Sequence, residues 1–376
     1  METSNKKRIA FLTSSRADFG IYFPLIEKIL VEKKSKFIVD IIAFGSHLSE
    51  LHGNTIKEIE PLACNIIKIE TLLASDNAVS IDTSIGICFI RFADFWNNNK
   101  NKYSTVFCLG DRYEMFAAVY SGLPFNINFT HIHGGETTEG SLDNIYRHSI
   151  SLASTTHFVS LEDYKSRLIN LLGEDNQIYH VGALSLDKII NHQLYSIDEF
   201  YSLFKIDLNI KTVLFTFHPE SDKDSKTIKS QFEFIIELIN EVSVDYQIIV
   251  SQPNTDKDGS KLRTMLNDKF NTNDRVILSE SLGFKGYFTA IKYCSFLLGN
   301  SSSGIIEAAS FKKFVINVGD RQKGRIHGMN VLNSEFNMNK IKNLILEVEN
   351  SPTDLIKNIY FNGGASDKII NWLENA

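Results

Sequence analysis

The chain has 376 residues, of which 43% are hydrophobic and 22% charged, a composition typical of a globular protein. This length exceeds that of one ordinary domain, so we expect two. A net charge of −6 without any basic block argues against a nucleic-acid-binding surface, and no apolar stretch approaches the roughly 18–20 residues of a membrane span. The four cysteines form no CxxC pair, which predicts reduced thiols in a cytoplasmic protein.

Short apolar runs alternate with amphipathic stretches from the start of the chain, where we expect a first strand rather than a signal peptide. In the first half, strands are expected at 8–12, 37–43, 105–109 and 127–132, and helices at 24–32, 85–97, 114–121 and 142–153. The pattern then restarts, with strands expected at 212–217, 247–250, 276–278, 296–298 and 314–318 and a final helix at 367–373. Such alternation predicts an α/β protein whose parallel sheets carry helices on both faces.

Two such series predict two Rossmann-like lobes with a cleft between them. We expect the N-terminal lobe at 1–182 and the C-terminal lobe at 183–358, with the polar, weakly periodic segment 182–207 as their junction. The last residues, 359–376, are expected to form a helix that packs back on the N-terminal lobe.

Polar clusters follow six of the expected strands. They are Ser14–Arg16, Gly110–Arg112, His131–Glu136, His218–Glu220, Pro253–Asp256 and Asn300–Ser303. Because ligands of doubly wound sheets bind beyond the carboxyl ends of the strands, we expect these clusters to face one cleft.

The sequence Gly-Asn-Ser-Ser-Ser-Gly at 299–304 is the most informative of these clusters. A helix is expected to open at Ser302 or Ser303, and its free N–H groups, with the hydroxyls of Ser301, Ser302 and Ser303, predict an anion site. Glu307, about one helical turn further on, could accept hydrogen bonds from sugar hydroxyls. The alternative is an ordinary capped helix, since serine is a favoured N-cap.

Asp111 and Arg112 stand on a turn just past a buried strand. The alternative to a catalytic role is an N-capping aspartate with an exposed arginine. Asp143 and Arg147 lie four residues apart on an expected helix, so they share a face and could simply pair, which is compatible with one of them also touching a substrate.

The segment His131-Ile-His133-Gly-Gly-Glu136 is denser still. Its paired glycines allow a tight turn that would aim His133 and Glu136 into the cleft, whereas we expect His131 to be buried and hydrogen-bonded. A metal site is an alternative, but no local pattern supplies a convincing third ligand, so no metal is expected.

Further candidates are a histidine and three arginines. His218 ends a strand just before a proline, where it could donate to a phosphate or act as an acid or base. Arg16, Arg321 and Arg325 are either solvated charges or clamps on a diphosphate. No GxGxxG sequence follows the first strand, and no GxSxG or P-loop sequence occurs, so no nicotinamide or flavin cofactor is expected.

Together these segments resemble the hydrolysing UDP-N-acetylglucosamine 2-epimerases, most closely the bacterial enzymes that supply sialic-acid-type sugar synthesis. The matching segments are Gly-Asp-Arg (110–112), His-Ile-His-Gly-Gly-Glu (131–136), Asp143 with Arg-His (147–148), Phe-His-Pro-Glu (217–220), Gly-Asn-Ser-Ser-Ser-Gly (299–304) and Gly-Asp-Arg-Gln-Lys-Gly-Arg (319–325), in order within Arg8 to Val331. The resemblance also covers residues 46–48, 53–55 and 253–256. It implies the two-lobed GT-B fold, UDP held mainly by the C-terminal lobe, no organic cofactor and a homodimer or homotetramer.

The resemblance implies that UDP-N-acetylglucosamine is converted to free N-acetylmannosamine and UDP. Anti elimination of UDP would give 2-acetamidoglucal, to which water would add with the configuration at C2 inverted. The same reaction on UDP-2,4-diacetamido-2,4,6-trideoxyglucose, for legionaminic-acid-type sugars, is an alternative, and a GT-B glycosyltransferase is another.

The resemblance also implies roles for individual residues. The expected catalytic residues are Asp111, His133, Glu136, Asp143, Arg147 and His218. The expected substrate- and UDP-binding residues are Arg16, His47, Arg112, Asn254, Ser301, Ser302, Ser303, Glu307, Arg321 and Arg325.

The chain departs from the family pattern at two positions. Many members carry Glu where His133 stands, so His133 could substitute, Glu136 could reach in, or Asp111 and Asp143 could suffice. A family Lys five residues after Arg16 is Ile here, so the phosphates are expected to depend more on Arg321 or Arg325.

Overall fold

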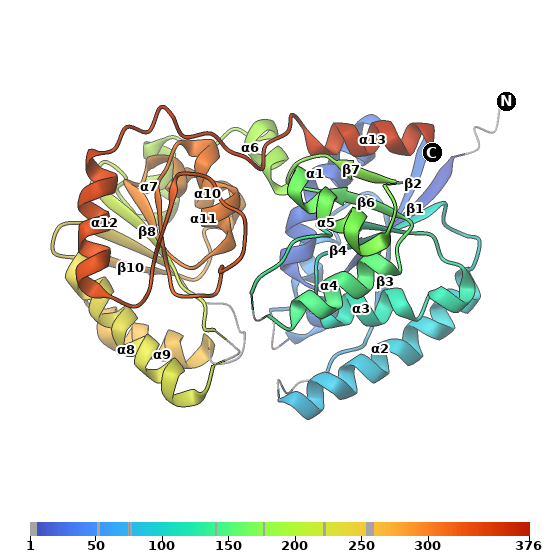
Figure 1. The fold of residues 1–376 in the computed structure, drawn as a ribbon, viewed down its shortest axis with the longest axis horizontal. Coiled ribbons are helices and arrows are strands. Elements are labelled where there is room, and N and C mark those ends of the chain that lie inside the picture. The colour runs from blue at the N-terminus through green and yellow to red at the C-terminus, as the bar shows by residue number, and fades with distance from the viewer. Residues whose placement is uncertain are drawn as a thin grey trace. The chain divides into compact units, whose positions relative to one another are not determined.

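The computed structural model describes residues 6–50, 53–73, 75, 77–139, 141–175, 177–220, 223–252 and 259–376. The chain divides into two compact units (Figure 1). Unit 1 comprises Met1–Thr137, Ser141–Asp187 and Tyr360–Ala376, and unit 2 comprises Thr138–Gly140 and Lys188–Ile359. Each unit has one parallel sheet packed between helices, which confirms the predicted α/β class. None of the described helices is long and apolar enough to cross a membrane.

Unit 1 is built on a seven-stranded parallel sheet in the order β3-β2-β1-β4-β5-β6-β7. Its strands are β1 (Lys7–Thr13), β2 (Phe37–Phe44), β3 (Asn65–Ile69), β4 (Thr105–Leu109), β5 (Phe129–Ile132), β6 (Thr156–Val159) and β7 (Ile178–His180). Its helices are α1 (Arg16–Glu32), α2 (Ala78–Asn99), α3 (Tyr113–Tyr120), α4 (Asp143–Leu152), α5 (Glu162–Leu172) and α13 (Ala365–Asn375). The strand order reverses between β1 and β4, which creates the switch point where doubly wound sheets bind ligands.

Both faces of this sheet are buried, which explains why its strands are apolar without alternation. Successive side chains of β1 enter different cores: Ile9 and Phe11 pack with α1 and α13, whereas Ala10 and Leu12 pack with α2 and α3. The central strands are therefore mostly hydrophobic, and buried polar residues within them, such as Asp40 in β2 and His131 in β5, have hydrogen-bond partners. Other polar residues gather where the strands end.

Helix α1 begins at Arg16, eight residues before the predicted start at Pro24. Ser15 caps it, accepting a hydrogen bond from the backbone N–H of Asp18, while the Asp18 carboxylate accepts from the backbone N–H of Ser15. The prediction placed the start at Pro24, but the capping box sets it at Arg16, and Pro24 lies inside the helix.

The end of the chain belongs to unit 1. Helix α13 packs on α1, where Asp367 pairs with Lys28 at 2.5 Å and Glu374 with Lys33 at 2.8 Å. The buried carboxylate of Asp187 accepts hydrogen bonds from the backbone N–H groups of Ala365 and Ser366 at the start of α13. Asp187 therefore supplies acceptors for two of the backbone N–H groups that have no partner within the first turn of the helix.

Unit 2 is built on a six-stranded parallel sheet in the order β10-β9-β8-β11-β12-β13. Its strands are β8 (Thr212–Thr216), β9 (Gln247–Ser251), β10 (Val276–Ser279), β11 (Phe296–Gly299), β12 (Val315–Val318) and β13 (Val331–Ser334). Its helices are α7 (Ile197–Phe204), α8 (Ser225–Val242), α9 (Gly259–Phe270), α10 (Gly283–Tyr293), α11 (Ser302–Ile306) and α12 (Met338–Asn350), and the short α6 (Asp187–Asn191) lies at the division between the units. The switch point lies between β8 and β11.

Candidate functional site

In unit 1, Asp111 and Arg147 form an ion pair at the switch edge of the sheet. Asp111 lies two residues after β4, and Arg147 reaches it from α4 through Nη2. A second nitrogen of the same guanidinium, Nη1, donates to the main-chain carbonyl of His133 at 2.8 Å. Because the side chain of Arg147 is only 5% exposed, this fork joins the ends of β4 and β5 inside the protein.

This ion pair replaces two simpler arrangements that the sequence allowed. Asp111 does not cap α3, whose N-cap is Arg112, and Arg112 instead binds Glu114 in a bidentate pair at 3.2 and 2.9 Å. Asp143 accepts a hydrogen bond from Ser141, while Arg147 is directed to Asp111 rather than along its own helix. Arg147 therefore pairs with Asp111 at the end of β4 instead of with Asp143, which lies four residues before it on α4.

The turn after β5 carries the second part of the group. Nδ1 of His133 lies 2.6 Å from Oε1 of Glu136, and both side chains are under 10% exposed. Ser160, just after β6, donates to the same carboxylate oxygen at 3.1 Å. The backbone of His133 has a positive φ of 64°, a left-handed conformation that a non-glycine residue adopts at a cost.

His131 lies beneath this turn and is fully buried, as predicted. Its Nε2 lies 2.9 Å from the carbonyl oxygen of Gly110, and its Nδ1 lies 3.0 Å from the hydroxyl of Ser151. Burial lowers its pKa well below the ordinary value, so the ring is neutral. His131 thus holds β4 and α4 against β5.

Asp143 lies at the start of α4, close enough to Asp111 for their charges to interact. Its pKa is raised, first by loss of hydration and then by the negative charge of Asp111. A carboxyl with a raised pKa beside a second carboxyl is suited to take part in proton transfer.

Three predicted binding residues of unit 1 have partners within the protein. His47 is fully buried, and its ring nitrogens contact the hydroxyls of Thr13 at 2.9 Å and Thr55 at 2.8 Å. It therefore has no ring nitrogen left for a ligand in this arrangement. Arg16, at the first position of α1, is half exposed and pairs with Glu58 at 3.0 Å, and Arg112 is held by Glu114.

In unit 2, Asn300 ties the two central strands together. Its Oδ1 accepts from the backbone N–H of His218 at 2.7 Å, and its Nδ2 donates to the carbonyl of His218 at 2.8 Å. The preceding Gly299 has φ +129°, and a Cβ there would lie 2.0 Å from the carbonyl oxygen of Thr216. The glycine lets β8 and β11 approach closely, which places His218 beside the serine turn.

The serine turn forms the start of α11, as predicted, but the helix spans only Ser302–Ile306. Ser301 caps it by accepting from the N–H of Ser303 at 3.3 Å. Five residues generate little macrodipole, so an anion at this turn would depend mainly on local N–H and hydroxyl donors. Glu307 is 8% exposed and follows the helix directly.

Tyr287 of α10 joins this turn, although it was not predicted. Burial raises the pKa of its phenol, while the neighbouring hydroxyls of Ser303, Thr216 and Ser301 lower it. A tyrosine in a helix next to other apolar residues is indistinguishable in sequence from a core residue. Only its proximity to the hydroxyls of Ser303, Thr216 and Ser301 in the folded structure identifies it.

The loop after β12 contributes Arg321 and Arg325. Arg321 donates to the carbonyl of Asn300 at 3.1 Å, as Gln322 does at 3.0 Å, whereas Arg325 is half buried in the same loop. Buried Glu220 holds the loop by accepting from the N–H of Asp320 at 2.8 Å. Asn254, the remaining predicted binding residue, lies outside the described residues.

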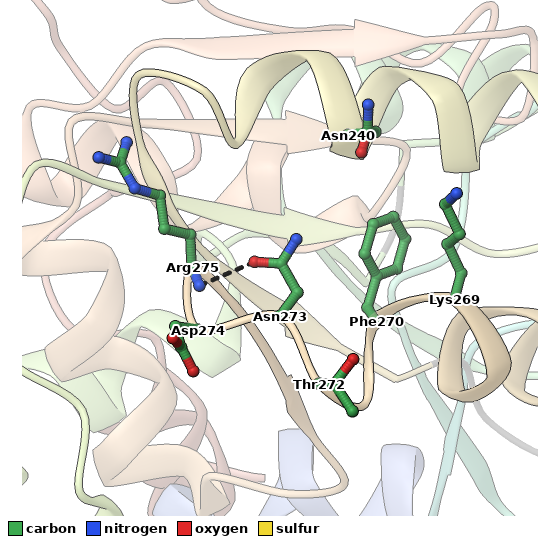
Figure 2. A pocket seen from close by; sticks show the side chains of 7 residues that line it. All are labelled: Asn240, Lys269, Phe270, Thr272, Asn273, Asp274 and Arg275. Atoms are coloured by element: carbon green, nitrogen blue, oxygen red, sulfur yellow. Dashed lines mark hydrogen bonds between the residues drawn. The ribbon is translucent and has the colours of Figure 1, made fainter.

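A hollow of about 570 Å³ elsewhere in unit 2 contains none of the predicted residues. Figure 2 shows its lining: Asn240, Lys269, Phe270, Thr272, Asn273, Asp274 and Arg275. It lies at the amino end of β10, whereas the serine turn and His218 lie at the carboxyl ends of β11 and β8. Since ligands of this sheet class bind at the carboxyl ends, the hollow is not the candidate site.

The structure thus forms two groups of predicted residues, one at the switch point of each unit. Unit 1 brings together Asp111, His133, Glu136 and Arg147, with Asp143 nearby. Unit 2 brings together His218, Ser301, Ser303 and Arg321 through Asn300 and the loop after β12. His47 and Arg16 lie at the margin of the first group.

Comparison with known proteins gives a consistent result. The sequence profile of the family described as UDP-N-acetylglucosamine 2-epimerase matches residues 30–374. A GDP/UDP-N,N'-diacetylbacillosamine 2-epimerase (hydrolyzing) from Campylobacter jejuni is 33% identical over 89% of this chain and 85% of its own, and a UDP-N,N'-diacetylbacillosamine 2-epimerase (hydrolyzing) from Legionella pneumophila is 32% identical over 98% and 96%. The crystal structure of Methanocaldococcus jannaschii UDP-GlcNAc 2-epimerase in complex with UDP-GlcNAc and UDP has the same fold, with a TM-score of 0.79, 19% identity and coverage of 98% and 100%. The chain belongs to the UDP-N-acetylglucosamine 2-epimerase family.

Proposed function

We propose that this protein is a hydrolysing 2-epimerase that converts a UDP-linked 2-acetamido sugar of the glucose series into the free mannose-series sugar and UDP. The observation that carries the proposal is the group formed by Asp111, Arg147 and His133 at the switch point of unit 1, in a chain of this family. Removal of a proton from C2, which is not acidic, requires positioned groups of this kind.

The proposed reaction has two stages. In the first, the C2 proton and the C1–O bond to UDP are lost together, giving 2-acetamidoglucal. In the second, water adds to C1 and a proton to the opposite face of C2. Asp111 and Asp143 are proposed to take part in these proton transfers, since the charge of one affects the proton affinity of the other.

Unit 2 is proposed to hold the leaving nucleotide. As the C1–O bond breaks, negative charge grows on the diphosphate, and fixed donors stabilise it without reorganising. The hydroxyls and N–H groups of the serine turn, His218 and Arg321 are the proposed donors, and Glu307 the proposed acceptor of ribose hydroxyls. No organic cofactor is needed, and a cytoplasmic homo-oligomer stays a prediction.

Two substrates are proposed, which differ at C4 and C6 of the sugar. UDP-N-acetylglucosamine, giving N-acetylmannosamine, is the substrate in the family's name. UDP-2,4-diacetamido-2,4,6-trideoxyglucose, which is UDP-N,N'-diacetylbacillosamine, is supported by the names of the Campylobacter and Legionella relatives. The full-length match to the Legionella protein favours the diacetamido sugar.

Both substrates can be tested in one experiment. The purified protein is incubated with each UDP-sugar in D₂O, and products are identified by NMR. We expect UDP and a free mannose-series sugar deuterated at C2, with the higher kcat/KM identifying the substrate. Release of UDP without deuterium at C2 would mean simple hydrolysis, and a donor consumed only after addition of a sugar acceptor would mean a glycosyltransferase.

A further inference from the structure

The turn at 133–136 contains a buried histidine–carboxylate pair in which the second ring nitrogen, Nε2, has no assigned role. The His133 and Glu136 side chains are 8% and 4% exposed, and Nδ1 and Oε1 lie 2.6 Å apart. Nε2 of His133 is buried and has no hydrogen-bond partner among the residues that the structure describes. Buried polar atoms are almost always satisfied, so this atom requires an explanation.

The pair determines which ring nitrogen can accept a proton. A carboxylate only accepts hydrogen bonds, so Nδ1 must carry the hydrogen that lies between it and Glu136. In the neutral ring Nε2 then carries the lone pair. Ser160 donates to the same oxygen of Glu136 at 3.1 Å, which fixes the carboxylate in turn.

The backbone of the turn is held by hydrogen bonds at several points. The backbone N–H of His133 donates to Phe158 at 3.0 Å, and its carbonyl accepts from Arg147 at 2.8 Å. Arg167 donates to the carbonyl of Gly135 at 2.6 Å. Contacts from three neighbouring elements therefore maintain the left-handed backbone of His133, a strain that persists only where the surroundings impose it.

Charged groups of both signs surround the pair. Glu136 lies directly against the ring, and the nearest guanidinium, that of Arg147, is paired with Asp111. Arg167 contributes positive charge at the far side of the turn, and His131, below it, is neutral. Of these charged groups, the Glu136 carboxylate is the one hydrogen-bonded to the ring.

We propose that His133 accepts the C2 proton at Nε2, with Glu136 and Ser160 as positioning residues. The inference rests on the proposed function. The electrons of the C2–H bond form the C1–C2 double bond, the C1–O electron pair leaves with UDP, and the proton stays on the imidazole until it passes to solvent.

The test compares four variants and one control variant with the wild-type enzyme. His133→Gly and His133→Asn suit the site because both residues tolerate a positive φ, so folding is preserved. Either change should lower kcat by about 10²–10⁴-fold, the usual contribution of general base catalysis. Imidazole added to the glycine variant should restore at least tenfold, with saturation, because the missing ring is replaced.

The positioning residues should show smaller effects that appear in kcat rather than KM. Glu136→Gln removes the charge next to the ring and should lower kcat about 10–100-fold. Ser160→Ala should lower it about threefold to tenfold, since one hydrogen bond to a charged group is lost. Ser121→Ala is the matched control: Ser121 is a buried serine whose hydroxyl donates to Ala118, and the change should leave kcat within about twofold.

A spectroscopic measurement makes the test independent of turnover. The wild-type protein labelled with ¹⁵N-histidine should show a strongly downfield Nδ1–H proton, which Glu136→Gln and both His133 variants should abolish. Absence of this signal in the wild type, or folded His133 variants with normal kcat, would overturn the proposal while leaving the epimerase function intact. A wild-type enzyme that releases no UDP from either sugar would defeat the proposed function and this assignment together.

Discussion

The two switch points hold their polar groups in different ways. In unit 1 the group is ionisable, and Arg147, His133 and Glu136 are all less than 10% exposed. In unit 2 the central contact is a neutral amide, that of fully buried Asn300, surrounded by serine hydroxyls and backbone groups. Buried ionisable groups can exchange protons, whereas fixed neutral donors can bind a charge that does not change its protonation. The comparison therefore divides the proposed reaction into chemistry in unit 1 and nucleotide binding in unit 2.

The largest expected effect comes from Asp111→Asn. The asparagine keeps the shape but cannot exchange a proton, so kcat should fall by about 10²–10⁴-fold while the Kd for UDP stays within about threefold. Steady-state kinetics and calorimetry with UDP separate the two quantities. The control is Asp163→Asn, an exposed aspartate of α5. Normal turnover in a folded Asp111→Asn protein would remove Asp111 from the mechanism, and an equal loss of UDP affinity would contradict the division of roles.

The second effect is structural and belongs to unit 2. Gly299→Ala places a Cβ 2.0 Å from the Thr216 carbonyl at a φ of +129°, so the free energy of unfolding should fall by about 2–4 kcal/mol. Urea unfolding measures the loss, and UDP affinity should fall with it because β8 and β11 separate. Gly86→Ala is the control: Gly86 lies in α2 with no described atom within 4 Å of the added Cβ, and the change should be neutral or stabilising. Equal stability of the two variants would show that the close approach is not required.

Much of this comparison could be predicted from the sequence. Buried parallel strands are mostly apolar without alternation, so β1, β2, β4, β8 and β11 could be located to within one or two residues, and the polar clusters at their ends followed. Shorter or less buried strands, such as β3 with its exposed Asn65 and β7 with three residues, gave no comparable signal.

The partners of the site residues could not be predicted. Arg147 was expected to share a helix face with Asp143, but its pairing with Asp111 depends on how α4 packs beside β4, which is information of tertiary structure. Ser160 follows β6, a four-residue strand that was not predicted, so its contact with Glu136 was also missed. The residue types at strand ends are local information, whereas the hydrogen bonds that position them are not.

The third prediction concerns nucleotide binding alone. Glu307→Ala should weaken UDP binding about tenfold, the value of one hydrogen bond to a charged acceptor, and should leave kcat at saturating substrate nearly unchanged. Calorimetry with UDP and initial-rate kinetics measure the two effects. Glu233→Ala on the solvent side of α8 serves as the control. Unchanged UDP affinity would exclude the ribose contact, and a fall in kcat alone would place Glu307 in the chemistry.

The smallest expected effect is a difference between the two units in how their stability depends on pH. Burial lowers the pKa of His47 from 6.5 to about 4, and that of His157 likewise to about 4, and both lie in unit 1. Between pH 6.5 and about pH 4 each of these histidines binds a proton in the unfolded chain but not in the folded protein. The free energy of unfolding therefore falls as the pH falls, by about 1 kcal/mol per pH unit for each ring. Hydrogen exchange at pH 6 and pH 5 should therefore show protection lost in unit 1 before unit 2.

His47→Gln removes one titrating group and should reduce this pH dependence, whatever its effect on stability at neutral pH. Equal acid sensitivity of the two sheets would contradict the expectation that the buried histidines of unit 1 determine which unit loses protection first.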